Sequence, residues 1–232
     1  RRSSDLLFCF GTRPEAIKMA PIIHELKRRG IKFIVCVTGQ HREMLDGVLR
    51  FFKIQPDYDL DLMTRGQSLN ALSASILKGF DAIIEKERPE VILVQGDTTT
   101  ALMASIAAFH RKVPVAHIEA GLRTFDLNSP FPEEANRQLI SKIAEFHFTA
   151  TDSAKTNLLK ESVSEDKIFV TGNTVIDALI LGKSHLYYQK ENEEISHLKR
   201  IIDLKKKIIL VTGHRRENFG KGIEEVCRAL VK

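Results

Sequence analysis

The sequence of 232 residues predicts an α/β fold built on a Rossmann-like parallel sheet. Two observations lead to this prediction. Short apolar runs rich in β-branched and aromatic residues alternate with longer segments of helical periodicity, which is typical of repeated βαβ units. The apolar runs also lack a regular alternation of apolar and polar residues, as expected for strands that helices cover on both faces.

The expected strands and helices follow one another along most of the chain. The strands are Leu6–Phe10, Lys32–Thr38, Val91–Gln95, Val115–Ile118, Phe146–Ala150, Ile168–Thr171 and Ile208–Thr212. The helices lie near residues 14–29, 41–52, 68–87, 99–111, 133–144, 152–162 and 174–188. In the first helix Ile17, Ala20 and Ile23 recur at helical spacing, which predicts one apolar face against the sheet.

The net charge of +5 is distributed unevenly. Basic and acidic side chains balance over residues 1–182, so the excess lies within 183–232. We interpret 1–182 as an N-terminal Rossmann-like domain, 183–206 as a polar linker and 207–232 as the beginning of a second, incomplete domain. One strand and one helix cannot bury their own apolar faces. A nucleic-acid partner is not expected, because its binding calls for basic residues gathered on one face.

Several other classes of protein are excluded. The sequence has no apolar run long enough for a transmembrane helix, and no signal peptide at its N-terminus. The three cysteines are far apart in sequence and show neither a disulfide framework nor metal-ligand spacing. We therefore expect a cytoplasmic protein with no membrane partner and no bound metal. The absence of the motifs GxGxxG and GxxxxGK[ST] argues against a dinucleotide or Walker site.

The loop after the first expected strand has the composition of an anion pocket. Ligands of doubly wound sheets bind beyond the carboxyl ends of the strands. Here Gly11 permits a tight turn, Pro14 suits a first helical turn, and the new helix presents open N–H groups. Arg13 and Lys18 add positive charge, although Arg13 as a solvated turn residue is the alternative. Gln40 follows the second strand in a similar position.

Three carboxylates are expected at the same edge of the sheet. Asp97 follows the strand 91–95, Glu119 ends the next one, and Glu133 begins a helix that also carries Arg137. Carboxylates that share a cleft separate their pKa values and can divide acid and base roles. The alternatives are that Asp97 caps a helix and that Glu133 and its neighbour stabilise a helix dipole.

The last expected strand is followed by Thr212-Gly213-His214-Arg215-Arg216. A histidine beside arginines at such a position suits a ligand that carries phosphate. His214 and Arg215 are therefore candidate binding residues on the incomplete second domain.

The sequence contains seven motifs in the following order: GTRPEAIKMAP, TGQHREML, QGDTTTA, HIEAGLRT, PFPEEANR, GNTVIDAL and GHRREN. From about Leu6 to the C-terminus they resemble the non-hydrolysing UDP-N-acetylglucosamine 2-epimerases. The resemblance implies two Rossmann-like domains around a cleft, a glycosyltransferase-B-like architecture of which this chain holds the first half. It also implies interconversion of UDP-GlcNAc and UDP-ManNAc for bacterial surface polysaccharides, with no cofactor, in a homodimer.

The resemblance assigns roles to residues already singled out. Asp97, Glu119 and Glu133 become the acid and base groups, with Lys18 and His214 as further catalytic residues. The substrate-binding residues are Arg13, Gln40, Arg137, His214 and Arg215. Which carboxylate serves which face of the sugar is left open.

Two departures from the family pattern bear on activity. Family members continue through a whole second domain, so we expect the chain alone to turn over little substrate. Many bacterial members have the segment Gln-His-Arg-x-Gln for activation by a second substrate molecule. In this sequence Gln-His-Arg is followed by Glu43 and Met44, so the second Gln is missing. The alternatives are an epimerase of a modified UDP-sugar, a glycosyltransferase of similar fold, and an inactive nucleotide-sugar-binding fragment.

Overall fold

The computed structural model describes residues 6–39, 42–62, 64, 66–188, 193–211 and 221–231. The chain divides into two units, Arg1–His185 and Leu186–Lys232. Within the described ranges, no helix is both long enough and apolar enough to cross a membrane.

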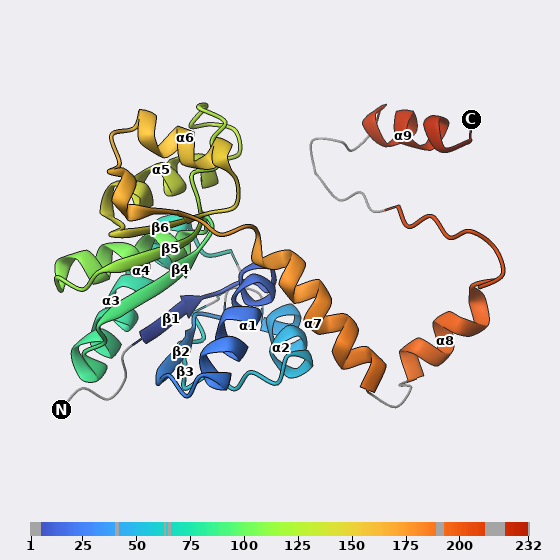
Figure 1. Cartoon of the computed structure of the whole chain (residues 1–232), viewed down its shortest axis with the longest axis horizontal. Helices are drawn as coiled ribbons and strands as arrows, with labels where there is room; N and C mark the ends of the chain where they lie inside the picture. The colour runs from blue at the N-terminus through green and yellow to red at the C-terminus, as the bar shows by residue number, and fades with distance from the viewer. Residues whose placement is uncertain are drawn as a thin grey trace. The chain divides into compact units, whose positions relative to one another are not determined.

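The first unit is built on one sheet of parallel strands (Figure 1). The strands are β1 (Leu6–Phe10), β2 (Phe33–Val37), β3 (Tyr58–Asp59), β4 (Val91–Gln95), β5 (Val115–Ala120), β6 (Phe146–Thr149) and β7 (Ile168–Val170). Their order across the sheet is β3-β2-β1-β4-β5-β6-β7. This arrangement confirms the predicted Rossmann-like α/β fold. The short edge strand β3 was not predicted.

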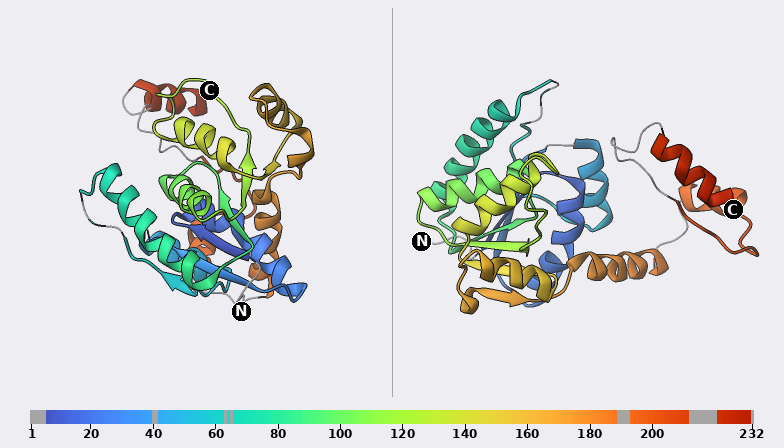
Figure 2. Two further views of the ribbon diagram at one scale, coloured as in Figure 1. Left: turned by 90° about the vertical axis from the view of Figure 1, so that its left-hand side faces the viewer. Right: turned by 90° about the horizontal axis from the view of Figure 1, so that it is seen from above.

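Helices cover both faces of the sheet. The helices are α1 (Arg13–Arg28), α2 (Arg42–Phe51), α3 (Leu69–Glu87), α4 (Thr99–His110), α5 (Glu133–Ile143), α6 (Asp152–Lys160) and α7 (Thr174–Tyr188). One core joins α1, α2 and α7 to the sheet, and a second core joins α3, α4 and α5 to its other face. The right-hand view of Figure 2 shows α4 and the pair α1 and α2 on opposite sides of the strands.

Alternate residues of β1 supply the two cores. Phe8 and Phe10 pack on the side of α1, while Leu7 and Cys9 pack on the side of α3 and α4. Side chains of a strand point alternately to the two faces of a sheet. Because both faces are covered here, every second position is apolar as well, which is why the sequence shows an unbroken apolar run.

Two of the cysteines lie opposite each other in the sheet. Parallel pairing of β1 with β2 sets Cys9 against Cys36, and both thiols are buried and free. Burial raises the pKa of the Cys9 thiol well above its usual value, so the thiol remains protonated. Both thiols are buried because each lies in a strand that contributes to the core on the side of α3 and α4.

The second unit contains α8 (Glu193–Ile201) and α9 (Lys221–Val231). The strand expected at Ile208–Thr212 is wrong for its described part, because residues 208–211 belong to no strand, and Thr212 lies outside the described residues. Ile209 and Leu210 are 81% and 86% exposed. A strand exists through pairing with a neighbour, and an apolar run without one does not form a sheet.

The buried ring of His117 on β5 predicts a loss of stability in acid. Burial lowers its pKa from 6.5 to about 3, so below pH 6.5 the unfolded chain binds a proton that the folded chain does not. The free energy of unfolding should therefore fall as the pH drops, by about 2 kcal/mol for this one group between pH 7 and pH 5. Urea unfolding followed by circular dichroism at both pH values measures the loss.

Two variants act as checks on this prediction. His110→Gln changes an exposed ring and should keep the full loss. His147→Gln should show a smaller loss, because burial lowers the pKa of His147 to about 4. Equal stability of the unchanged chain at pH 7 and pH 5 would contradict the assignment.

Candidate active site

The carboxyl edge of the sheet has one topological switch point. β1 lies between β2 and β4, so the chain winds to one side through β2 and β3 and to the other side through β4 to β7. Ligands of open α/β sheets bind in the crevice at such a point. The loops that open there follow β1, at residues 11–12, and β4, at residues 96–98.

Glu119 at the end of β5 accepts hydrogen bonds from three side chains of this edge. Its Oε2 accepts hydrogen bonds from Lys18 Nζ at 2.5 Å and from Gln95 Nε2 at 2.6 Å. Its Oε1 accepts from Asn173 Nδ2 at 2.8 Å. The side chains of Lys18 and Glu119 are 22% and 12% exposed, so water screens their ion pair only in part. The site therefore pairs the Glu119 carboxylate with the Lys18 ammonium group.

The backbone at Glu119 explains how its side chain reaches this position. Its φ is +63°, in the left-handed region that non-glycine residues seldom adopt. The register between β5 and β6 shifts at the same place, between Ile118 and Ala120. A bulge of this kind re-aims a side chain.

Asp97 lies on the turn between β4 and α4. Thr98, not Asp97, caps α4, since its side chain accepts from Ala101 N. The alternative of Asp97 as a helix cap is thus wrong. Asn136 Nδ2 donates to the Asp97 carbonyl oxygen at 2.8 Å, and Arg137 Nη1 lies 3.4 Å from Asp97 Oδ2.

The surroundings of Asp97 favour its protonated form. Burial raises the pKa of Asp97, and the charges of Glu133 and Glu119 raise it further, while Arg137 and Lys18 act in the opposite direction. Asp97 can thus keep a proton at a pH where a solvated aspartate has lost it. Carboxylates in different surroundings at the same edge can divide acid and base roles.

Glu134 anchors the loop that leads into α5. It is fully buried, and it accepts from the backbone amides of Thr124 and Phe125 at 3.0 and 3.1 Å. Arg137 Nε donates to it at 2.6 Å. Burial raises the pKa of Glu134, but hydrogen bonds, foremost those from Gln138 and the two amides, outweigh burial and lower it to about 2. Helix-dipole stabilisation is therefore only part of its role.

Four of the predicted site residues meet directly in two pairs, Lys18 with Glu119 and Arg137 with Asp97. Glu133 begins α5 close enough for its charge to act on Asp97. Arg137 is largely buried between two carboxylates, which suits it to hold Asp97 in place.

The predicted anion pocket is only partly open. Arg13 is exposed on the first turn of α1. The amides of Gly11 and Thr12 are already bonded to the Glu15 carboxylate. An anion here would depend on the Arg13 side chain more than on the backbone. Three further candidates, Gln40, His214 and Arg215, lie outside the described residues.

Two bonded partners of Glu119 were missed from the sequence, Gln95 and Asn173. Gln95 is the one polar residue of β4 and ends that strand at the carboxyl edge. Asn173 directly precedes α7, after β7. A polar residue at the carboxyl end of a parallel strand is the signal that could have identified both.

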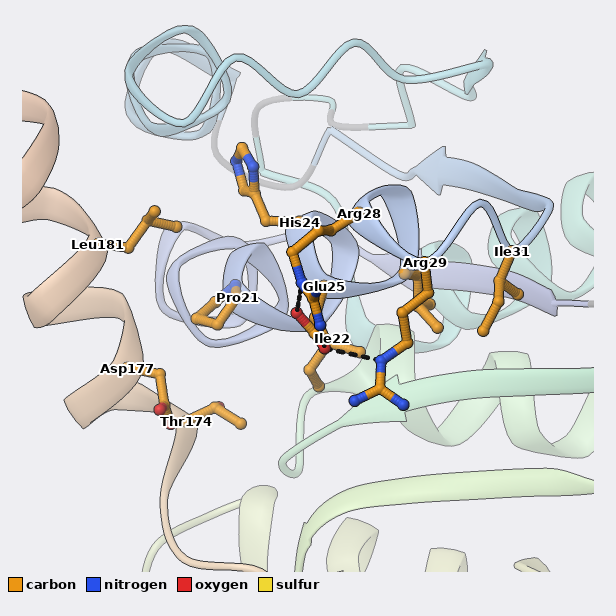
Figure 3. Close-up of a pocket in the computed structure, with 11 residues that line it drawn as sticks. Pro21, Ile22, His24, Glu25, Arg28, Arg29, Ile31, Thr174, Asp177 and Leu181 are labelled. Atoms are coloured by element: carbon orange, nitrogen blue, oxygen red, sulfur yellow. Dashed lines mark hydrogen bonds and ion pairs between the residues drawn. The ribbon is translucent and has the colours of Figure 1, made fainter.

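A separate hollow of about 800 Å³ lies between the second half of α1 and α7. Figure 3 shows Glu25 bonded to Arg28 and Arg29 beside it, with Asp177 and Leu181 on α7. The carboxylates of the sheet edge do not line it. None of the residues that line this hollow belongs to the two loops of the switch point.

A family model described as UDP-N-acetylglucosamine 2-epimerase matches residues 24–232. The chain belongs to this family. Proteins named UDP-N-acetylglucosamine 2-epimerase from Yersinia pestis and Escherichia coli K12 are 54% and 53% identical to it. These alignments cover 98% and 97% of this chain but 61% and 60% of the relatives. The chain thus spans about three fifths of their length.

Solved structures of epimerases have the same fold. The Neisseria meningitidis UDP-GlcNAc 2-epimerase, solved with UDP-GlcNAc bound, superposes with a TM-score of 0.89 at 49% identity, over 97% of this chain and 61% of that one. MurG from Acinetobacter baumannii superposes with a TM-score of 0.50 at 12% identity over 73% of this chain and 45% of that one, which shows a shared fold alone.

The anchoring role of Glu134 can be tested by hydrogen exchange in this epimerase-family chain. Glu134→Gln keeps the shape but replaces one acceptor oxygen with a donor, so the amides of Thr124 and Phe125 should exchange about 10-fold faster or more, for a lost bond of about 1.5 kcal/mol or more. NMR-detected exchange reports each amide separately. Glu133→Gln is the matched control and should leave both rates unchanged; equal rates in the two variants would contradict the anchor.

Proposed function

We propose that this chain supplies the sugar-side part of an enzyme that interconverts UDP-GlcNAc and UDP-ManNAc. The observation that carries the proposal is the meeting of three carboxylates at the switch point: Glu119 paired with Lys18, Asp97 with a raised pKa, and Glu133 acting on it. The relatives' names and the UDP-GlcNAc bound in the Neisseria meningitidis structure support the substrate class.

The proposed reaction is an elimination followed by an addition. C2 of the sugar has no adjacent carbonyl, so its hydrogen is too weakly acidic for simple deprotonation. When the bond from C1 to the UDP oxygen breaks, positive charge develops at C1 and makes the C2 hydrogen more acidic. Loss of that proton to a carboxylate forms the C1–C2 double bond of 2-acetamidoglucal. UDP then bonds to C1 again while a carboxylic acid protonates C2 from the opposite face.

The described residues suit this sequence of steps. Lys18 donates a hydrogen bond to the Glu119 carboxylate, a candidate proton acceptor, whereas the raised pKa of Asp97 suits a group that donates a proton. Glu133 is the third proposed acid or base group, and its charge raises the pKa of Asp97. Lys18 and the exposed Arg13 supply positive charge for the departing diphosphate. His214, Arg215 and Gln40 are proposed to bind the nucleotide on the basis of their motifs.

The wider setting is proposed on the same basis. Two buried free thiols fit a reducing compartment, so we place the enzyme in the cytoplasm. We further propose a homodimer that supplies ManNAc units for surface polysaccharides.

Deuterium incorporation at C2 tests the reaction. UDP-GlcNAc is incubated in D₂O with the 232-residue chain, and with the same chain joined to the part of the Yersinia pestis relative that it does not cover. We expect the joined protein to give UDP-ManNAc with deuterium at C2 by NMR, and the 232-residue chain to turn over little, since it spans about three fifths of its relatives' length. Transfer of sugar to an acceptor without exchange at C2 would point to a glycosyltransferase and overturn the proposal.

Substitution of the carboxylates tests their roles. Asp97→Asn and Glu119→Gln should each lower the exchange rate of the joined protein by at least about 100-fold, because a positioned proton donor or acceptor is lost. Glu25→Gln, at a surface ion pair on α1, is the matched control and should keep the full rate. Full exchange in both site variants, with unfolding midpoints near that of the unchanged protein, would refute the assignment.

A further inference from the structure

Glu15, on the first turn of α1, has a carboxylate that is almost completely buried, with 1% of the residue exposed. Its Oε2 accepts from the backbone amides of Gly11 and Thr12 at 3.0 and 2.7 Å. Its Oε1 accepts from the Thr98 hydroxyl at 2.8 Å. One side chain therefore joins two segments that are more than eighty residues apart in sequence.

These segments are the two loops of the switch point. Gly11 and Thr12 immediately precede Arg13, and Thr98 immediately follows Asp97. The ladder between β1 and β4 runs from Leu6 opposite Val91 to Phe8 opposite Leu93. The two loops lie beyond its last pair, so the carboxylate of Glu15 connects them where the ladder has ended.

Burial and hydrogen bonding act on the Glu15 carboxyl group in opposite directions. Burial raises the pKa of Glu15, which means that its surroundings oppose the charge, while the three hydrogen bonds favour it. A buried carboxylate costs free energy that an apolar side chain of similar size would not. Hydrogen bonds to an ionised carboxylate are roughly twice as strong as those to a neutral acceptor, so an amide at this position would weaken the connection.

We propose that Glu15 is a positioning residue that sets Asp97 relative to Arg13 by holding the two loops together. The role rests on the function proposed above, in which Arg13 binds the departing diphosphate and Asp97 transfers a proton. The leaving group and the transferred proton lie on adjacent sugar carbons. Arg13 and Asp97 must therefore be correctly placed relative to each other when both act on one bound sugar. A displacement of about 1 Å between such groups costs up to about 100-fold in rate.

Variants on both sides of the connection test the proposal in the joined protein. Glu15→Gln and Thr98→Val should each lower kcat about 10- to 100-fold with a smaller change in KM, whereas Thr98→Ser keeps the hydroxyl and should restore kcat to within about 3-fold. Thr98 also caps α4, so Ser68→Ala is the matched control: it removes an equivalent cap from α3 and should leave kcat unchanged.

A second readout needs no turnover. In the 232-residue chain labelled with ¹³C at aspartate carboxyl groups, Glu15→Gln should shift the measured pKa of Asp97 by about half a unit or more, because Asp97 moves relative to its charged neighbours. A residue that only stabilises the fold would change the unfolding midpoint and leave this pKa unchanged. If Glu15→Gln does not fold, Thr98→Val and Thr98→Ser serve for the same titration.

The outcomes separate the two proposals. Absence of exchange at C2 in the unchanged joined protein would overturn the proposed function. Normal exchange in the unchanged protein, with kcat and the pKa of Asp97 unaltered in Glu15→Gln and Thr98→Val, would overturn the positioning role. Loss of kcat in Ser68→Ala equal to that in Thr98→Val would also overturn it, since loss of a helix cap would then explain both.

Discussion

Every strand of the sheet is parallel to its neighbours, and the position of each functional group follows from this constraint. Parallel pairing requires the chain to return across the sheet through a helix after each strand, so all the loops that follow strands open on one edge. The reversal of winding between β1 and β4 leaves a gap in helical cover at that edge. Lys18, Asp97 and Glu119 come from three different βα units and meet there.

Burying several carboxylates at one edge requires a donor for each of them, and the donors differ. Glu119 has an ammonium group, Glu134 a guanidinium group and two amides, and Glu15 three neutral donors. Asp97 has the more distant guanidinium of Arg137 at 3.4 Å, and the charges of Lys18 and of other carboxylates also act on it. These unequal surroundings produce unequal proton affinities from chemically similar groups, which is the physical requirement for acid and base roles in one cleft.

Much of the fold could be predicted because its signal is local. Buried parallel strands are apolar throughout, and the helices between them repeat every three to four residues. The sequence analysis did not predict the two-residue β3 and wrongly predicted a strand at 208–211, because a strand depends on pairing with a neighbouring strand. At the site, the motif order predicted Asp97, Glu119 and Lys18 as functional residues, and these roles stay predictions. It gave no sign that Thr98 would cap α4, since Asp97 and Thr98 are both good capping residues.

The sequence by itself determined the fold class, the family and the edge of the sheet at which the polar residues gather, because apolar periodicity and loop composition are properties of short segments. Only the tertiary structure decided which of those residues touch. The bond from Asn173 to Glu119 and the bonds of Glu15 to both loops join segments far apart in the chain, and the left-handed backbone at Glu119 aims its side chain. Such contacts depend on the order of the strands across the sheet, because that order decides which loops lie side by side.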